Sequence, residues 1–131
     1  MIWRHIRRRL RDESGNATVE AVLWLPLFLL FLALVFDTSM TFFNQSQILR
    51  LTQDANRGVA TGQIRSASEA EEFIRSGVQL LGANPTVSTV VAGNIVRSQV
   101  VVRAGDLGGV GLLGLIGNIE LRIGSQHLLE G

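Results

Sequence analysis

The sequence contains no cysteine and no tyrosine, and all twelve of its basic residues are arginine. Without cysteine the chain cannot form disulfide bonds, thiolate metal sites or a cysteine nucleophile. Its two histidines, His5 and His127, lie at opposite ends of the sequence, so no metal cluster or Ser/His/Asp arrangement can be drawn. We therefore expect a protein that is not an enzyme and has no catalytic residue, no metal site, no cofactor and no small-molecule substrate.

The net charge of +1 hides an uneven distribution along the chain. Residues 1–15 hold five arginines and two acidic residues, whereas the remainder is net acidic. A basic tip before an apolar run is the signature of a segment held in the cytoplasm. The arginines closest to that run form the predicted positive-inside leader: Arg7, Arg8, Arg9 and Arg11.

Nucleic acid is the other partner that an arginine cluster could bind. Only Trp3 and His5 interleave the arginines, however, and no nucleic-acid-binding fold follows them. The sequence therefore favours a membrane over a nucleic acid as the partner of this segment.

A run of sixteen residues without charge, from Ala21 to Phe36, dominates the N-terminal third of the chain. As a helix it would be about 24 Å long, and a bilayer core requires about 30 Å. Including flanking residues, a tilted span from Ala17 to about Met40 is plausible even though it passes Asp37. Pro26 lies inside the run, and membrane helices tolerate proline better than soluble ones do.

Three fates are possible for this segment. A secretory signal has a shorter apolar core and a small-x-small cleavage site after it, which is not found here. An uncut anchor explains the arginines and the hydrophobicity, but not Gly15 or Glu20. Cleavage before the apolar run, after Gly15, accounts for all of these features and leaves the helix on the mature protein.

The segment around Gly15 resembles the processing site of type IV prepilins, and more specifically that of the TadE-type pseudopilins of the tight-adherence (Flp) pilus system. The matching positions are Arg11-Asp12, Gly15, Val19-Glu20 and Leu25-Pro26. Ala21 stands where many Flp-family sequences carry an aromatic residue. The residues beyond the helix favour the minor, TadE-like class over a much shorter major pilin.

The resemblance implies that a membrane-embedded prepilin peptidase cuts between Gly15 and Asn16 on the cytoplasmic side. It also implies that Glu20 of one subunit neutralises the new N-terminal amine of a neighbour during assembly. The physics is compatible, because a carboxylate in hydrocarbon costs about 2.5–3.5 kcal/mol and the amine is charged at neutral pH. The alternative is that Glu20 is simply an interfacial residue at the membrane edge.

Downstream of the apolar run, Ile48, Leu51 and Ala55 recur at helical spacing and predict an amphipathic extension of the membrane helix. Gly58 and Gly62 are candidate helix ends. A second helix is predicted from Ser68 to Leu81, with Ser68 as its N-cap.

Three strands are predicted after the helices, over Thr86–Ala92, Ile95–Ala104 and Ile119–Ile123, because these segments are rich in β-branched residues. Gly93-Asn94 suggests a hairpin between the first two. Alternation in the second strand indicates one polar and one apolar face. The fold class is therefore α+β: a long membrane-spanning helix, a second helix and a small antiparallel sheet of about three or four strands.

The glycine-rich, largely apolar stretch from Asp106 to Asn118 joins the last two strands. One hypothesis is a flexible apolar flap that contacts partner pilins, but a loop or short helix covering the sheet is favoured. The stretch also contains G-x-G-x-x-G at residues 109–114, which no βαβ unit accompanies and which is therefore attributed to chance.

The sequence thus predicts a basic leader (residues 1–15), a transmembrane helix with its amphipathic extension (16–57) and a small extracytoplasmic α+β domain (58–131). We expect a TadE-like minor pseudopilin of the bacterial inner membrane, with its leader cytoplasmic and its C-terminal domain periplasmic, that acts in Flp/Tad pilus assembly and adhesion. After assembly it could be in the pilus or on the cell surface. Its expected partners are membrane lipid, the prepilin peptidase and other minor pilins. The alternative is an uncleaved single-pass envelope protein with a small periplasmic binding domain.

Overall fold

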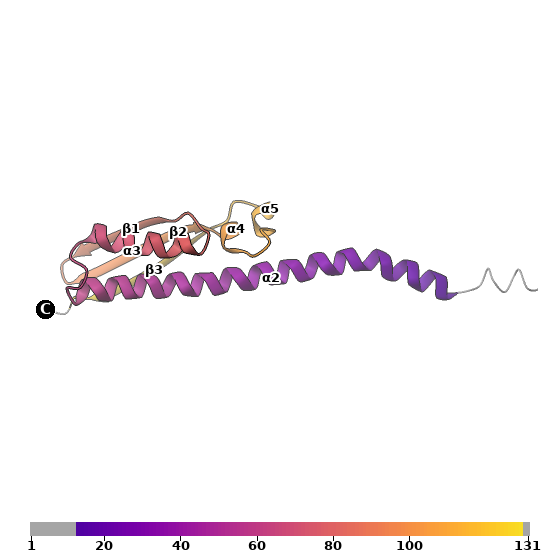
Figure 1. Cartoon of the computed structure of the whole chain (residues 1–131), viewed down its shortest axis with the longest axis horizontal. Helices are drawn as coiled ribbons and strands as arrows, with labels where there is room; N and C mark the ends of the chain where they lie inside the picture. Colours follow the sequence, from indigo (N-terminus) through magenta and orange to yellow (C-terminus); the bar gives the residue numbers. More distant parts are fainter. Residues whose placement is uncertain (1–12, 130–131) are drawn as a thin grey trace, which may run out of the picture. The chain divides into compact units, whose positions relative to one another are not determined.

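The computed structural model describes residues 13–129, and Figure 1 shows its helices and strands. The leader arginines Arg7, Arg8, Arg9 and Arg11 lie outside the described residues. The chain divides into two compact units, Met1–Ala33 and Leu34–Gly131. The second unit holds everything from the last part of the apolar run to the end of the sheet.

Helix α2 runs from Glu13 to Ala60 and continues through Pro26. No glycine interrupts the sequence between Gly15 and Gly58, which allows the helix to propagate. It ends where Gly62 adopts a left-handed φ of 80° and donates its N–H to the carbonyl oxygen of Val59 at 3.2 Å. Gly62 is therefore a helix stop, as predicted.

Gly58 is not a helix stop, which corrects one of the two predicted ends. It lies inside α2 and is buried. A Cβ at this position would come within 2.7 Å of the Ile64 Cδ1 atom. Gly58 thus lies where the chain folds back and the Ile64 side chain packs on α2, not where the helix ends.

Helix α3 spans Ala67–Leu80, and its N-cap is Ser66 rather than the predicted Ser68. The Oγ atom of Ser66 accepts a hydrogen bond from the Glu69 N–H at 3.1 Å. In return the Glu69 carboxylate accepts one from the Arg65 N–H at 3.0 Å. This reciprocal arrangement satisfies two backbone donors, and it places Ser68 as an exposed residue of the first turn.

Three strands form one antiparallel sheet in the order β1-β2-β3, with β1 over Thr86–Ala92, β2 over Ile95–Arg103 and β3 over Glu120–Leu128. The predicted α+β layout is confirmed. The third strand is five residues longer at its C-terminal end than predicted, because Gly124 and Ser125 pair with Gln99 and Ser98 of β2.

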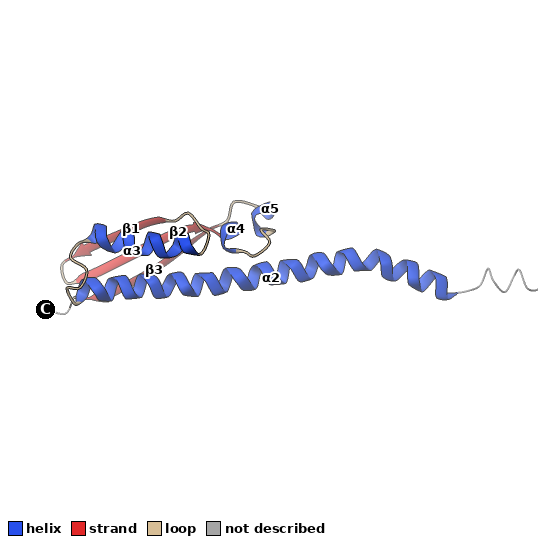
Figure 2. Cartoon of the chain, in the orientation of Figure 1, coloured by secondary structure: helices blue, strands red, loops and turns tan. Residues whose placement is uncertain are grey.

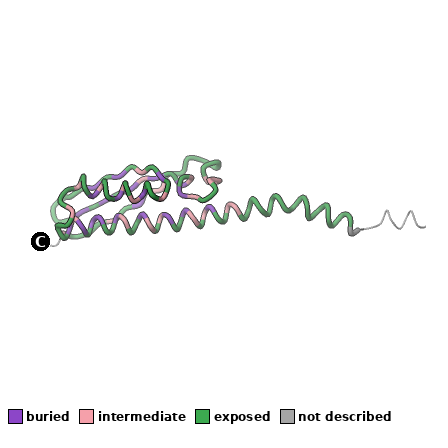
Figure 3. Tube along the Cα trace, in the orientation of Figure 1, coloured by how far each residue is buried: buried purple, intermediate pink, exposed green. Residues whose placement is uncertain are grey.

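One face of the sheet packs against the second half of α2 and against α3, which lie along it in Figure 2. In β2 the inward residues Val96, Ser98, Val100 and Val102 are buried, and the residues that alternate with them are exposed or half-buried. The predicted alternation is therefore confirmed. Ile48 and Ala55 of α2 are fully buried in the same core, and the buried positions of α2 are visible in Figure 3.

Two short helices, α4 (Ala104–Leu107) and α5 (Leu113–Ile116), occupy the connection between β2 and β3. Ala104 and Leu107 are buried and anchor its start to the core. The connection is thus short helix and loop; its hydrogen bonds with side chains run to α2, and it contains no crossover helix of a dinucleotide-binding unit.

Candidate processing and assembly site

Gly15 and Asn16, the predicted cleavage site, lie near the start of α2 and are exposed. A Cβ atom built on Gly15 would meet nothing within 4 Å. The backbone there is helical with negative φ, so neither conformation nor packing within the described residues requires a glycine at this position.

Glu20 is exposed on α2, four residues after Asn16. Residues four apart lie on the same face of a helix, so the carboxylate projects on the side of the predicted new N-terminus. The ion pair found within residues 13–129 joins Arg75 to Glu72; Glu20 forms none there. Its carboxylate therefore remains available to a group outside the described residues.

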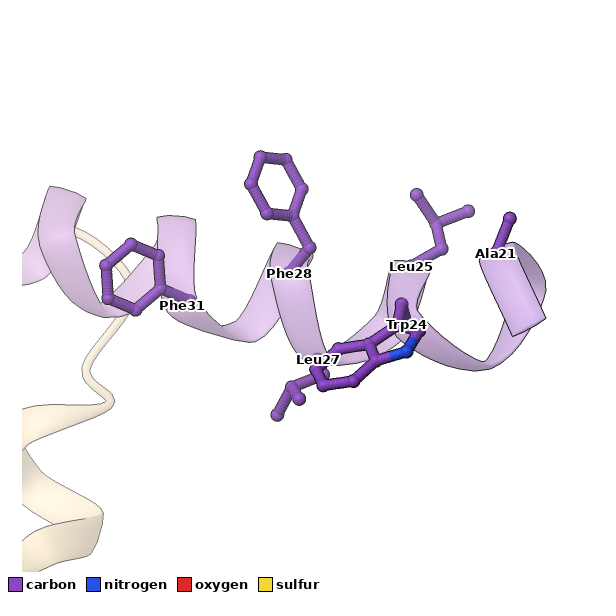
Figure 4. A pocket seen from close by; sticks show the side chains of 6 residues that line it. All are labelled: Ala21, Trp24, Leu25, Leu27, Phe28 and Phe31. Carbon is purple, nitrogen blue, oxygen red and sulfur yellow. The ribbon is translucent and has the colours of Figure 1, made fainter. Parts of the chain in front are cut away.

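The apolar part of α2 has almost no polar side chain to offer. Between Val19 and Leu32 its large hydrophobic residues are 46–72% exposed. A shallow hollow of about 690 Å³ lies on this stretch. Figure 4 shows the side chains that line it: Ala21, Trp24, Leu25, Leu27, Phe28 and Phe31.

One helix in the described part of the chain is long and apolar enough to cross a membrane, within Gly15–Ala60. The exposed apolar side chains just described belong to that helix. They fit an environment of lipid or of other apolar helices better than water.

The Asp37 side chain, immediately after the uncharged run, is held by several hydrogen bonds. It is fully buried, and its carboxylate accepts four backbone hydrogen bonds. Oδ1 accepts from the N–H groups of Val110 and Gly111, and Oδ2 accepts from those of Leu112 and Leu113. A buried carboxylate is tolerated when its lone pairs are satisfied in this way.

Other polar side chains follow Asp37 along the buried face of α2, spaced three or four residues apart. The Thr41 hydroxyl lies 2.9 Å from the Asp37 carbonyl oxygen of α2 and 3.5 Å from the Ala104 carbonyl oxygen of α4. Asn44 donates to the Leu107 carbonyl oxygen at 2.8 Å. Together with Asp37 they fasten the β2–β3 connection to α2.

Asn56, near the end of α2, joins that helix to the sheet. Its Nδ2 donates to the Ser125 carbonyl oxygen at 2.9 Å, and its Oδ1 accepts from the Ser98 hydroxyl. The Ser98 hydroxyl also lies 2.9 Å from that of Thr89. This buried network is satisfied throughout, and such networks fix one arrangement of the elements that they join.

Sequence reasoning did not assign a role to Asp37, Asn44 or Asn56. A signal was nevertheless present: polar residues at spacings of three or four shared the face of α2 that carries Ile48 and Ala55. Their partners lie 42 to 76 residues further along the chain, which local patterns do not reveal.

Among residues 13–129, no group of three His, Cys, Asp or Glu side chains is placed to hold a metal ion. The described surfaces instead offer an open glycine, an available carboxylate, a long apolar helix and a folded domain fastened to the end of that helix. These are features suited to processing, membrane insertion and assembly.

Comparison with known protein families gives one match, to the model described as TadE-like protein, over residues 15–57. The matched segment begins at Gly15 and includes Glu20, Asp37, Asn44 and Asn56. It confirms the resemblance found in the sequence. No curated protein and no solved structure gives a significant match.

Proposed function

We propose that this chain, which is TadE-like over residues 15–57, is a minor pseudopilin that acts in the assembly of Flp/Tad pili after a prepilin peptidase removes its leader. The observation that carries the proposal is the coincidence of the family match with one long apolar helix that begins beside Gly15. The association with pilus components follows from the family; cleavage and a role in adhesion are parts of the proposal.

Cleavage between Gly15 and Asn16 is supported by the surroundings of Gly15. Because a Cβ there would meet nothing, the fold does not explain the glycine. A peptidase that must bring its catalytic groups close to the backbone does explain it, since a side chain would obstruct that approach. The exposure of both residues is compatible with access by an enzyme.

Pairing of Glu20 with the N-terminal amine of a neighbouring subunit is supported by its position on an otherwise apolar surface. An unpaired carboxylate in that surface opposes burial among lipid or helices. An ammonium group supplied by a second protomer would remove this penalty at one register only, which favours a defined alignment of the helices.

The proposed location is the bacterial inner membrane, crossed once by α2. The arginine-rich leader would stay in the cytoplasm under the positive-inside rule, and the α3–sheet domain would lie in the periplasm. There it would meet other minor pilins and pilus assembly proteins.

The direct test is the intact mass and N-terminal sequence of the protein extracted from membranes that contain a prepilin peptidase. We expect a mature chain that starts at Asn16. A chain that retains Met1 while pilus assembly is normal would overturn the proposal and support an uncleaved single-pass envelope protein.

A pair of glycine variants sharpens this test. Gly15→Leu should accumulate as full-length precursor in the membrane. Gly117→Leu is the matched control, because a Cβ at Gly117 also meets nothing within 4 Å, and it should be processed normally. Unchanged processing of Gly15→Leu would show that Gly15 is not the cleavage site.

A further inference from the structure

We propose that the apolar loop, residues 108–119, rests in the lipid interface beside the outer end of the membrane-spanning part of α2. This loop sits between α4 and β3 and includes α5. The proposed partner is the bilayer itself, at the boundary between headgroups and acyl chains.

The side chains of the apolar loop point outward to an unusual degree. Val110, Leu115, Ile116 and Ile119 are 61%, 82%, 66% and 46% exposed, and no residue from 108 to 119 carries a charge. Exposed hydrophobic residues gathered on one short loop mark a surface that is covered by something other than water.

The backbone of the same loop is already satisfied from within. The N–H groups of Val110, Gly111, Leu112 and Leu113 donate to the Asp37 carboxylate. The next two, of Gly114 and Leu115, donate to the carbonyl oxygens of Gly111 and Leu112 at 3.2 and 3.0 Å. Six consecutive donors are therefore satisfied by protein acceptors, which lowers the cost of placing this backbone in the water-poor interface.

The charge of the Asp37 carboxylate is stabilised by the same contacts, which replace hydrogen bonds to water. A free carboxylate at this point of α2 would hold the helix out of the membrane. With both oxygens occupied by backbone N–H groups, the helix can enter the interface as far as Asp37. Phe42 and Phe43, just beyond it, are 64% and 57% exposed, and they extend the apolar surface.

The position of the apolar loop along α2 places it at membrane depth. A Cβ on Gly108 would lie 2.9 Å from the Asp37 Cγ atom, and one on Gly109 would overlap the Phe36 ring. Phe36 ends the uncharged run. A helix from Asn16 to Phe36 is about 31 Å long, which is close to the thickness of the hydrocarbon core.

Lipid fits this surface better than a protein does. Residues 108–119 themselves carry no charge. The charged residues beside them, Arg103 and Asp106, stand on β2 and α4, where the headgroup region can hydrate them. The surface also lies against Phe36, the last residue of the uncharged run of α2. The inference requires α2 to span the membrane, but it does not depend on cleavage at Gly15 or on a role in pili.

The test is depth-dependent quenching of single tryptophans in the full-length chain, reconstituted into vesicles of phosphatidylcholine and phosphatidylglycerol. Trp3 and Trp24 are replaced by phenylalanine, and the reporter is Leu115→Trp. Leu80→Trp is the matched control, because Leu80 is 88% exposed at the end of α3. Brominated phosphatidylcholine with bromine near the headgroup end of its acyl chains is the quencher.

We expect Leu115→Trp to be quenched about twofold by the shallow bromines and less by deeper ones, as for other interfacial segments. Leu80→Trp should be quenched little. Ile116→Trp provides a second reporter that needs no repacking, since Ile116 is also exposed. Quenching of both loop reporters no greater than that of Leu80→Trp would overturn the proposal. Protection of the Leu115→Trp reporter from water that increases only with the protein-to-lipid ratio would also overturn the proposal, because it would indicate that a protein covers this residue.

Discussion

Gly105 of α4 and Gly114 of α5 lie backbone against backbone: a Cβ on Gly105 would come within 2.7 Å of the Gly114 Cα atom. The relationship is not symmetrical. A Cβ on Gly114 would lie 3.7 Å from the Gly105 Cα atom, which is an ordinary van der Waals contact. The glycines of the β2–β3 connection are therefore not equivalent.

Gly105→Ala should destabilise the second unit by about 1–3 kcal/mol, because the backbone of α5 must move to admit the methyl group. Gly114→Ala should change stability by less than about 1 kcal/mol, since alanine favours a helix over glycine. Urea unfolding in detergent, followed by circular dichroism, measures both. Equal destabilisation by the two variants would contradict the packing described here.

Asp37→Asn should release the apolar loop from α2. The amide offers one acceptor oxygen instead of two, and its NH₂ group faces backbone donors, so the loss should be about 2 kcal/mol. Hydrogen exchange of the amides of residues 110–113 reports this directly and should accelerate. Asp54→Asn is the control, because Asp54 is an exposed acid on the same helix. Unchanged protection in Asp37→Asn would mean that the carboxylate does not hold these amides.

Asn56→Ala should cost about 2–3 kcal/mol, because it leaves the buried Ser98 hydroxyl without its acceptor and the Ser125 carbonyl oxygen without its donor. Gln53→Ala removes an amide from an exposed position of the same helix and should be close to neutral. Thermal unfolding of the two variants in the same detergent is the measurement. A neutral Asn56→Ala would show that water replaces the side chain without loss.

Ser66→Ala should lower stability by about 1 kcal/mol through the loss of the α3 N-cap. Ser68→Ala should have almost no effect, because Ser68 is an exposed residue of the first turn. The two changes remove the same hydroxyl group two positions apart. The denaturation midpoints of the two variants can therefore be compared directly. A larger effect of Ser68→Ala would indicate that Ser68, not Ser66, is the N-cap.

Glu20→Gln should leave membrane insertion intact or improve it, since an uncharged side chain enters the bilayer more easily. It should strongly reduce assembly, because the N-terminal amine of a neighbour would then be buried without a partner, at a cost of about 3–5 kcal/mol. Asp54→Asn again serves as the control. Surface pili are counted by electron microscopy, and normal pili in Glu20→Gln would exclude the pairing role.

The sequence predicted correctly those helices and strands whose bounds are set by residues close together in the chain. The bounds of β1 follow from the β-branched run Thr86–Ala92 and its flanking Pro85 and Gly93. The apolar run predicted a helix because nothing between Gly15 and Gly58 except Pro26 opposes one. The TadE-like resemblance rested on spacing around Gly15, and the family match covers that region.

The sequence was misread at positions whose structure depends on residues elsewhere in the fold. Gly124 and Ser125 are poor strand formers, yet pairing with β2 carries β3 through them. Ser66 and Ser68 both precede the apolar stripe of α3. The hydrogen bond from the Glu69 N–H to the Ser66 Oγ, with the one from the Arg65 N–H to the Glu69 carboxylate, distinguishes them. Asp37 looked like an interruption because its hydrogen-bond donors lie 73 to 76 residues later.

Glu71 of α3 has a consequence for how this domain can meet its neighbours. Its Oε1 accepts a hydrogen bond from the Thr89 N–H at 2.8 Å, halfway along the outer strand β1. A strand from another molecule could pair with β1 at Thr89 only after the Glu71 side chain had been displaced from this N–H group. Pairing of a second copy's strand along β1 is thereby made less favourable.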